Sequence, residues 1–246
     1  FHRGVATAAF REATNSALVL DGFKKELGIS IEVVSQEKEA QLAYQAVRLY
    51  NSDPAILVWD MGGGSFQFTS YDSQTKVWDI YKGILASMVF KDLVVHQVKK
   101  NSGQKAKLNS TANQSPNPMT MGEIKAARRL VQKTLKSDFE KSFLKRKSFT
   151  KVVGVEAVLN TSLKRHLRKS VYNVQDIDQW IATHHKKTDA ELEDIYSSTL
   201  VTNMILISEI MKLLRIDEIH THEASLVEGL LLSLDKDIAL NTEFKF

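Results

Sequence analysis

The chain has 246 residues, a net charge of +4, and 43% hydrophobic and 25% charged residues, which is the composition of an ordinary globular protein with a sizeable core. Because it contains no cysteine, disulfides and thiolate metal sites are excluded, and a reducing, cytoplasmic location is expected. No apolar run reaches the roughly 20 residues of a membrane span, since Asn203, Glu209 and Lys212 interrupt the longest one. We therefore interpret this run as a core helix and expect no membrane association.

The first third of the chain alternates between extended and helical patterns. A short extended stretch at 4–10 precedes a helix that ends on Gly28, and a strand at 29–35 precedes a helix over 36–50 that Ser35 caps. The period of the apolar residues then changes from 3.6 to 2, which predicts three consecutive strands joined by a glycine turn and a polar turn. These strands are 55–60, 65–72 and 76–83.

Helical patterns dominate the rest of the chain. A polar, proline-containing stretch at 100–118 has no periodicity and predicts a flexible loop. The helices on either side of it alternate with two short strands, which indicates a mixed α/β fold. The predicted helices are 84–98, 120–141, 156–169, 174–184, 189–196, 200–214 and 225–234, and the strands are 149–155 and 216–220.

Positive charge is concentrated in the middle of the chain, with 18 Lys/Arg against 4 Asp/Glu between Lys99 and Lys169. Such a segment attracts polyanions, whether phosphate chains, nucleic acid or a membrane surface. Solvated helix faces have the same composition, and this is our interpretation for most of these residues. Nucleic-acid binding is not favoured, because the basic residues lack interleaved aromatic side chains and match no known reader motif.

The stretch from Asp60 to Ser65, DMGGGS, joins two of the predicted strands and contains three of the chain's 11 glycines. A tight connection in which glycine supplies positive φ is one interpretation. The other is a phosphate-binding nest, since three glycines in a row let backbone N–H groups converge on an anion without interfering side chains. An aspartate at the end of a buried strand beside such a nest is suited to hold a divalent cation or a water next to the phosphate. The combination favours phosphoryl chemistry.

A second candidate is Glu39, on the apolar face of the helix predicted at 36–50. In helical spacing it aligns with Leu42, Ala43 and Ala46, and it lies near the helix N-terminus, where the dipole favours an ionised carboxylate. Two interpretations are equally compatible with this position. The residue is either a partly buried acid with a local partner or a general base that acts on a bound water.

Three stretches together resemble a known family: VATAAFREATN at 5–15, IEVVSQEKEAQLAYQAV at 31–47 and ILVWDMGGGSFQF at 56–68. In this order and spacing they look like the ALREAxN, SGxEEARL and DIGGGSTE stretches of the exopolyphosphatase / guanosine pentaphosphate phosphatase (Ppx/GppA) family, in the actin-like ATPase superfamily. Weaker similarities, VVGVEAVL at 152–159 and ASLVEGLLLSL at 224–234, extend the resemblance over nearly the whole chain.

The resemblance implies an α/β fold in which two RNase H-like lobes face each other across a cleft, with magnesium-dependent hydrolysis of phosphoanhydrides between them. It implies that residues 1–50 are the C-terminal portion of the first lobe and that residues 51–246 are the second lobe, a mixed sheet flanked by helices. It also implies polyphosphate or guanosine pentaphosphate as the substrate, and a homodimer as the assembly.

The same resemblance implies roles for individual residues. Glu39 matches the glutamate that activates the attacking water, and Asp60 matches the acid that orients the magnesium ion or the water. Arg11 matches an arginine that reaches toward phosphate, although a solvated helix position also suits this residue. The residues that match the second phosphate-binding loop are Gly62, Gly63, Gly64 and Ser65.

The sequence departs from the family pattern at several positions. Gln67 replaces an acid, which keeps hydrogen bonding but loses the negative charge that a cation needs. Lys38 replaces another acid, and Glu156 lies in a turn that is rich in glycine and threonine in the family. Gln41 and Val227 replace arginines, each of which would supply a phosphate hydrogen bond worth about 1.5–3 kcal/mol.

Two functions from different classes therefore stay open. The first is an enzyme of the Ppx/GppA type, with Glu39 as the base and Asp60 as the ligand of the metal or water. The second is a catalytically weakened binding module that senses phosphate or a nucleotide, and Gln67, Gln41 and Val227 favour it. The family's first phosphate loop, DxGSNS, has no counterpart in the sequence, so we expect only the tail of the first lobe here. A DxGSNS stretch upstream of Phe1 would favour the enzyme, and its absence there would favour the binding module.

Overall fold

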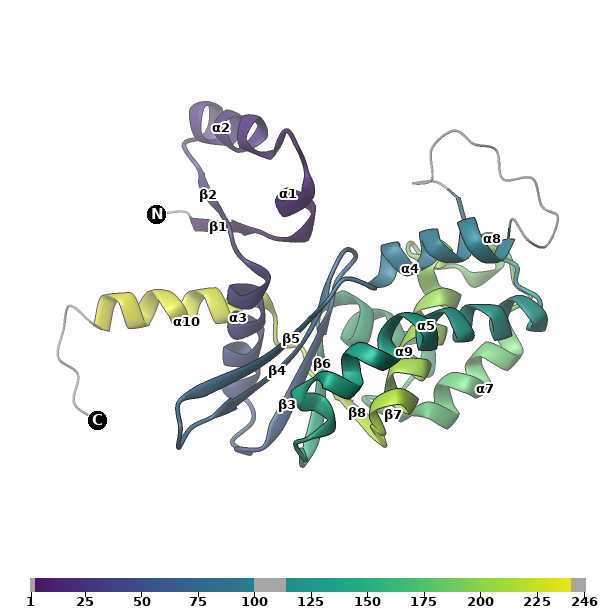
Figure 1. Ribbon diagram of the computed structural model, residues 1–246. Coiled ribbons are helices and arrows are strands. Elements are labelled where there is room, and N and C mark those ends of the chain that lie inside the picture. The colour runs from purple at the N-terminus through teal and green to yellow at the C-terminus, as the bar shows by residue number, and fades with distance from the viewer. Residues whose placement is uncertain (1–2, 100–113, 240–246) are drawn as a thin grey trace.

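The computed structural model describes residues 3–99 and 114–239, and Figure 1 shows two parts of unequal size. A small two-stranded unit precedes a large sheet of six strands that carries helices on both faces. The predicted α/β architecture, a mixed sheet flanked by helices, is confirmed. Of the loop predicted at 100–118, residues 100–113 lie outside the described residues.

The small unit pairs its two strands in parallel. Gly28 ends the second helix in the left-handed conformation with φ 67°, as the sequence predicts. The extended stretch predicted at 4–10 is wrong after Ala6, because the carbonyl of Thr7 accepts the amide of Arg11 and a helix begins there. The elements are β1 (Arg3–Ala6), α1 (Ala8–Glu12), α2 (Ser16–Leu27) and β2 (Ser30–Val33).

The large sheet has the strand order β5-β4-β3-β6-β8-β7. Strand β3 pairs antiparallel with β4 and parallel with β6, so the sheet changes from antiparallel to parallel pairing at β3. The strand β7 is missing from the sequence prediction, since three residues are too few to show a period of two. The strands are β3 (Ile56–Met61), β4 (Phe66–Asp72), β5 (Val77–Gly83), β6 (Lys151–Val155), β7 (Val171–Asn173) and β8 (Glu218–Thr221).

Helices cover both faces of this sheet (Figure 1). On one face lie α3 (Gln36–Arg48) and α10 (Leu226–Ala239). The other helical elements are α4 (Ser87–Leu93), which continues as a π-helix (Val94–Lys99), α5 (Met121–Lys141), a 3₁₀ turn (Phe143–Lys145), a π-helix (Ala157–Leu163), α6 (Lys164–Leu167), α7 (Val174–His184), α8 (Asp189–Leu192) and α9 (Ser197–Leu214). The helix predicted at 189–196 is shorter than expected because Glu193 adopts a left-handed conformation with φ 51°.

Strand β3 is buried on both faces and so separates two hydrophobic cores. Leu57, Trp59 and Met61 belong to the larger core, beneath α4, α5, α7 and α9. Ile56 and Val58 belong to the smaller core, beneath α3 and α10. Since side chains alternate along a strand, this burial fixes which face each residue of β3 presents. Helix α3 therefore packs on the large sheet, and the predicted lobe boundary at residue 50 stays a prediction.

Within the described residues, α9 is long and apolar enough to cross a membrane by length and composition alone. However, 72% of this helix is buried inside the structure, where it packs between α5, α7 and α4. The prediction of a core helix is confirmed.

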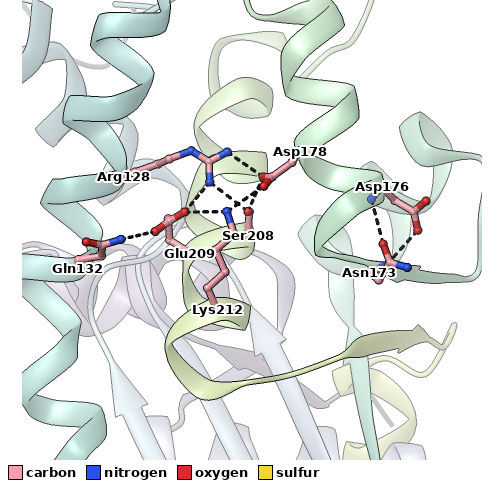
Figure 2. A network of polar contacts seen from close by, with 8 residues as sticks. All are labelled: Arg128, Gln132, Asn173, Asp176, Asp178, Ser208, Glu209 and Lys212. Atoms are coloured by element: carbon pink, nitrogen blue, oxygen red, sulfur yellow. Dashed lines mark hydrogen bonds and ion pairs between the residues drawn. The ribbon is translucent and has the colours of Figure 1, made fainter.

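An ion-pair network joins the helices on the larger core's side of the sheet (Figure 2). Arg128 of α5 pairs with Asp178 of α7 at 2.7 Å and with Glu209 of α9. Lys212 contacts the same two carboxylates at 2.8 and 3.1 Å, and Ser208 donates to Asp178 at 2.7 Å. Because the side chain of Glu209 is only 2% exposed, these two cations rather than water stabilise its charge.

Removing Arg128 tests this network. We expect Arg128→Met to lower the free energy of unfolding by about 3 kcal/mol, because the buried carboxylate of Glu209 then keeps only one cation. Urea unfolding of Arg128→Met, Glu209→Gln and the double variant forms a mutant cycle. The double variant should lose less than the sum of the single losses, and additive losses would show that the pair is not coupled.

The packing of α10 against α3, on the face of the sheet that holds the smaller core, can be tested at Gly229. A β-carbon on Gly229 would lie 2.0 Å from the carbonyl oxygen of Leu42, so Gly229→Ala is expected to lower the free energy of unfolding by about 1–3 kcal/mol. The control is Gly22→Ala in α2, where a β-carbon meets nothing within 4 Å and where we expect a gain of about 0.5–1 kcal/mol. Urea unfolding followed by circular dichroism measures both, and a neutral Gly229→Ala would contradict the close crossing.

Candidate active site

Asp60 lies at the carboxyl end of β3, next to the glycine turn. It follows the alternation of Ile56 and Val58, so its side chain lies on the face of the sheet that α3 covers. The residue is only 4% exposed, and no described residue donates a hydrogen bond to its carboxylate. A buried carboxylate without a donor is costly unless a ligand or a proton compensates it.

The glycine turn is held by backbone hydrogen bonds to itself and to helix α4. The amide of Gly62 donates to the carbonyl of Ser65 at 3.0 Å. The carbonyls of Gly62 and Gly63 accept the amides of Ser87 and Met88, the first two residues of α4, at 3.3 and 2.9 Å. The turn is therefore fixed against the N-terminus of this helix.

Two of the three glycines, Gly63 and Gly64, lie in close packing contacts, and none of the three is needed for a left-handed backbone. None of them has a positive φ, so the interpretation that they supply left-handed turn positions is wrong. A β-carbon on Gly63 would lie 3.3 Å from Cγ of Met88, and one on Gly64 would lie 3.2 Å from Cβ of Ala8. The turn is thus the place where the small unit approaches the large sheet.

Arg11 connects three elements at this place. Its Nη1 donates to Oε2 of Glu39 at 2.8 Å and to the carbonyl of Val34 at 3.0 Å, and its Nη2 donates to Oγ of Ser65 at 3.1 Å. The side chains of Arg11 and Glu39 are 18% and 12% exposed. The alternative of a solvated helix position for Arg11 is therefore wrong, and the guanidinium joins α1, α3 and the glycine turn.

Two glutamines complete the polar contacts around the turn. Nε2 of Gln36, at the start of α3, donates to the carbonyls of Phe66 and Gly83 at 3.1 and 3.2 Å, which ties α3 to strands β4 and β5. Nε2 of Gln67 lies 3.4 Å from Oγ of Ser65. Gln67 is 1% exposed, and its Oε1 is buried without a partner. The residue that replaces the family's acid is therefore an interior side chain.

A cavity of about 310 Å³ opens between the small unit and the large sheet. Of the residues predicted from the sequence, Glu39, Asp60, Gly62 and Gly63 line it. Arg11 is hydrogen-bonded to Glu39, which lines the cavity, and to Ser65 of the glycine turn. Gly64 packs against Ala8 of α1 instead. Glu39 and Asp60, which are 21 positions apart in the sequence, thus contribute their carboxylates to the same cavity.

Two carboxyl groups in this cavity, Asp60 and Glu39, have raised pKa values. Burial raises the pKa of Asp60 well above its ordinary value of 3.8, and the neighbouring charges of Glu156 and Glu39 raise it further. Burial also raises the pKa of Glu39, against the hydrogen bond and charge of Arg11, which lower it. Negative charge is therefore in excess here, since Arg11 is the one cation named among these interactions of the described residues.

Glu156 is the functional candidate that the sequence reasoning missed. It follows Val155, the residue of β6 that pairs in parallel with Asp60, and it lines the same cavity. Ligands bind at the carboxyl ends of parallel strands, so its place just after the strand predicted at 149–155 was a signal that could have identified it.

The raised pKa of Asp60 makes stability depend on pH. Because the folded chain holds this proton more tightly than the unfolded chain, the free energy of unfolding falls by about 1.4 kcal/mol per pH unit between the ordinary pKa of 3.8 and the raised pKa of the folded chain. We expect Asp60→Asn to unfold at a higher temperature than the wild type near pH 7 and to lose this advantage near about pH 4. Thermal unfolding across this range measures it, with the exposed Asp217→Asn as the control. A difference that is the same at every pH would contradict the assignment.

Comparison with known proteins agrees with this architecture. The Ppx/GppA phosphatase family matches residues 3–237. A solved exopolyphosphatase-like protein is similar with a TM-score of 0.73 and 18% identity over 96% of this chain and 78% of that one. A Ppx/GppA family member from Aquifex aeolicus gives 0.68 and 20% identity over 98% and 75% of the two chains. An exopolyphosphatase from Cytophaga hutchinsonii gives 0.67 and 18% identity over 95% and 74%.

Similarity to curated sequences is confined to a shorter region. The proteins named Exopolyphosphatase 1 from Mycobacterium bovis and Mycobacterium tuberculosis are 40% identical over 67 residues, which is 26% of this chain. The match spans 20% of the length of these relatives. The solved structures share the α/β fold of this chain, and the match to the family covers nearly the whole chain. The chain belongs to the Ppx/GppA phosphatase family.

Proposed function

We propose that this chain is a phosphoanhydride hydrolase of the exopolyphosphatase / guanosine pentaphosphate phosphatase type, with polyphosphate or guanosine pentaphosphate as its substrate. The observation that carries the proposal is the meeting of Glu39, Asp60 and the glycine turn in one cavity. The relatives named exopolyphosphatase support the same reaction class. A cytoplasmic location, expected from the absence of cysteine, and a homodimer, implied by the family resemblance, also belong to this proposal.

Glu39 is the general base in this proposal. Water attacks the terminal phosphorus, the bridging P–O bond breaks, and its electron pair leaves with the shortened phosphate chain, while the proton of the water passes to the Glu39 carboxylate. A raised pKa suits this role, because a base is most effective when its pKa lies near the working pH. Arg11 fixes the position of the carboxylate through the 2.8 Å hydrogen bond to Oε2.

The glycine turn binds phosphate in this proposal. Gly63 and Gly64 are exposed, and their amides have no acceptor among the described residues. Backbone amides in such a turn form a concave site for an anion. Arg11, which already contacts Ser65 of the turn, adds a charged donor at its edge.

The residues of the cavity suit a magnesium ion held by Asp60. Its buried carboxylate has no donor among the described residues, and a phosphate chain that enters a cavity with an excess of carboxylates needs a cation to compensate both charges. Magnesium is commonly held by one or two carboxylates together with substrate phosphates and water. No group of three or more Asp, Glu or His side chains among the described residues is placed to hold a metal ion by itself, so water and phosphate oxygens would supply the other ligands. When bound, the ion would neutralise charge on the phosphate chain.

A binding module without turnover is the second candidate function. Gln67 provides an amide where the family has an acid, and its buried Oε1 has no partner. Gln41 and Val227 do not supply the guanidinium groups of the family pattern, and Val227 is 63% exposed. This candidate requires binding of phosphate or nucleotide without hydrolysis.

The enzyme proposal predicts magnesium-dependent phosphate release that depends on Glu39. We expect Glu39→Ala to lower kcat at least about a hundredfold, since this is the usual contribution of a general base. Phosphate release from polyphosphate and from guanosine pentaphosphate is measured with the full-length protein. The control is Glu37→Ala, an exposed residue two positions earlier on the same helix, which should retain activity.

Calorimetry with the same two ligands separates the candidate functions. Binding of either ligand without any phosphate release would overturn the enzyme and support the binding module. Failure of the wild type both to bind and to hydrolyse would contradict both.

A further inference from the structure

The carboxyl ends of β3 and β6 bring two acidic side chains to the same edge of the large sheet. The two strands are parallel, with Asp60 paired to Val155, so Glu156 continues β6 beside the end of β3. Both side chains line the 310 Å³ cavity.

The backbone of Glu156 is held in an uncommon conformation. With φ 65° and ψ −174°, it occupies a region that is almost confined to glycine and costs energy for any other residue. The family resemblance places a turn rich in glycine and threonine here, so the glutamate is an acidic substitution at a position that disfavours it. Its Oε1 accepts the amide of Leu226 at 2.8 Å, which orients the carboxylate and leaves Oε2 without a donor among the described residues.

Asp60 provides the second, independent observation. It is 4% exposed, lines the cavity, and accepts no hydrogen bond from a described residue. The guanidinium of Arg11 is already occupied by Glu39, Val34 and Ser65. A cation is therefore the group that would compensate the carboxylates of Asp60 and Glu156.

We propose that Asp60 and Glu156 together hold one divalent cation of the magnesium class, with water and, when present, phosphate oxygens as the remaining ligands. Glu156 thereby supplies, from the end of β6, the negative charge that the family pattern supplies at position 67. Gln67 cannot do so, because its amide is neutral and its Nε2 faces Oγ of Ser65. Two carboxylates are sufficient protein ligands for such an ion. The inference adds a second protein ligand to the magnesium ion of the proposed function, and it rests on that function for the role of the ion in hydrolysis.

Manganese binding tests the site without any reference to catalysis. Mn²⁺ is titrated into the wild-type protein and followed by electron paramagnetic resonance, and Mg²⁺ is then added as a competitor. We expect one Mn²⁺ per chain that Mg²⁺ displaces, and a loss of affinity of at least about tenfold in both Asp60→Asn and Glu156→Gln. The control is Glu223→Gln, whose side chain is 81% exposed.

Glu156→Gln also separates a ligand from a merely structural residue. Its amide oxygen can still accept the amide of Leu226, so the fold should be kept, as circular dichroism and the Tm without metal would show. Mn²⁺ should raise the Tm of the wild type and of Glu223→Gln but not that of Glu156→Gln. Equal Mn²⁺ affinity in the wild type and Glu156→Gln, or no Mn²⁺ binding by the wild type, would overturn the inference.

Failure of the inference and failure of the proposed function give different results. Magnesium-dependent phosphate release, combined with unchanged Mn²⁺ binding in Glu156→Gln, would leave the hydrolase standing and remove Glu156 from the site. Mn²⁺ binding that needs Asp60 and Glu156, without any phosphate release, would leave the cation site standing and remove the hydrolase.

Discussion

Strand β3 is buried on both of its faces, and the position of every group in the cavity depends on this burial. Successive apolar side chains of the strand pack alternately into the two cores. A shift by one residue or a rotation of the strand would therefore remove these side chains from their cores. The carboxylate at its end is thereby turned toward α3, where Glu39 lies. Parallel pairing with β6 then brings Glu156 to the same edge of the sheet.

The second constraint is electrostatic. Three carboxylates face one cavity, and the cation named among their interactions, Arg11, is held by hydrogen bonds to Glu39, Val34 and Ser65. Such an arrangement lowers the stability of the empty chain at neutral pH and favours ligands that bring positive charge or protons. The buried carboxylate of Asp60 and the strained backbone of Glu156 lie at the same site. Strained backbone conformations cluster at functional sites.

The small unit is part of the site rather than an appendage. Thr7 lines the cavity, Ala8 packs against Gly64, and Arg11 fixes the side chain of Glu39. Gln36 ties the start of α3 to β4 and β5, so the distance between the proposed base and the glycine turn is set by side-chain hydrogen bonds from both units. Motion between the two units would therefore change the geometry of the site directly.

Much of the fold could be predicted from local pattern. Periods of 3.6 and 2 located the main helices and strands, and Ser35 and Gly28 cap helices as expected, because capping and left-handed backbone are local properties. The strand β7 and the helix α1 could not be predicted, since three and five residues are too few to show a period.

For the site, the sequence by itself determined which residue types carry the chemistry: an acid on an apolar helix face, an acid before three glycines, and the resemblance to a family. The tertiary structure decided which of these residues lie in contact with one another. It placed Gly63 and Gly64 in close contact with Met88 and Ala8, because contacts between elements distant in the chain are invisible to local pattern. It also joined Arg11 to Glu39 and placed Glu156 beside Asp60, because strand pairing and helix packing bring together residues that lie far apart in the chain.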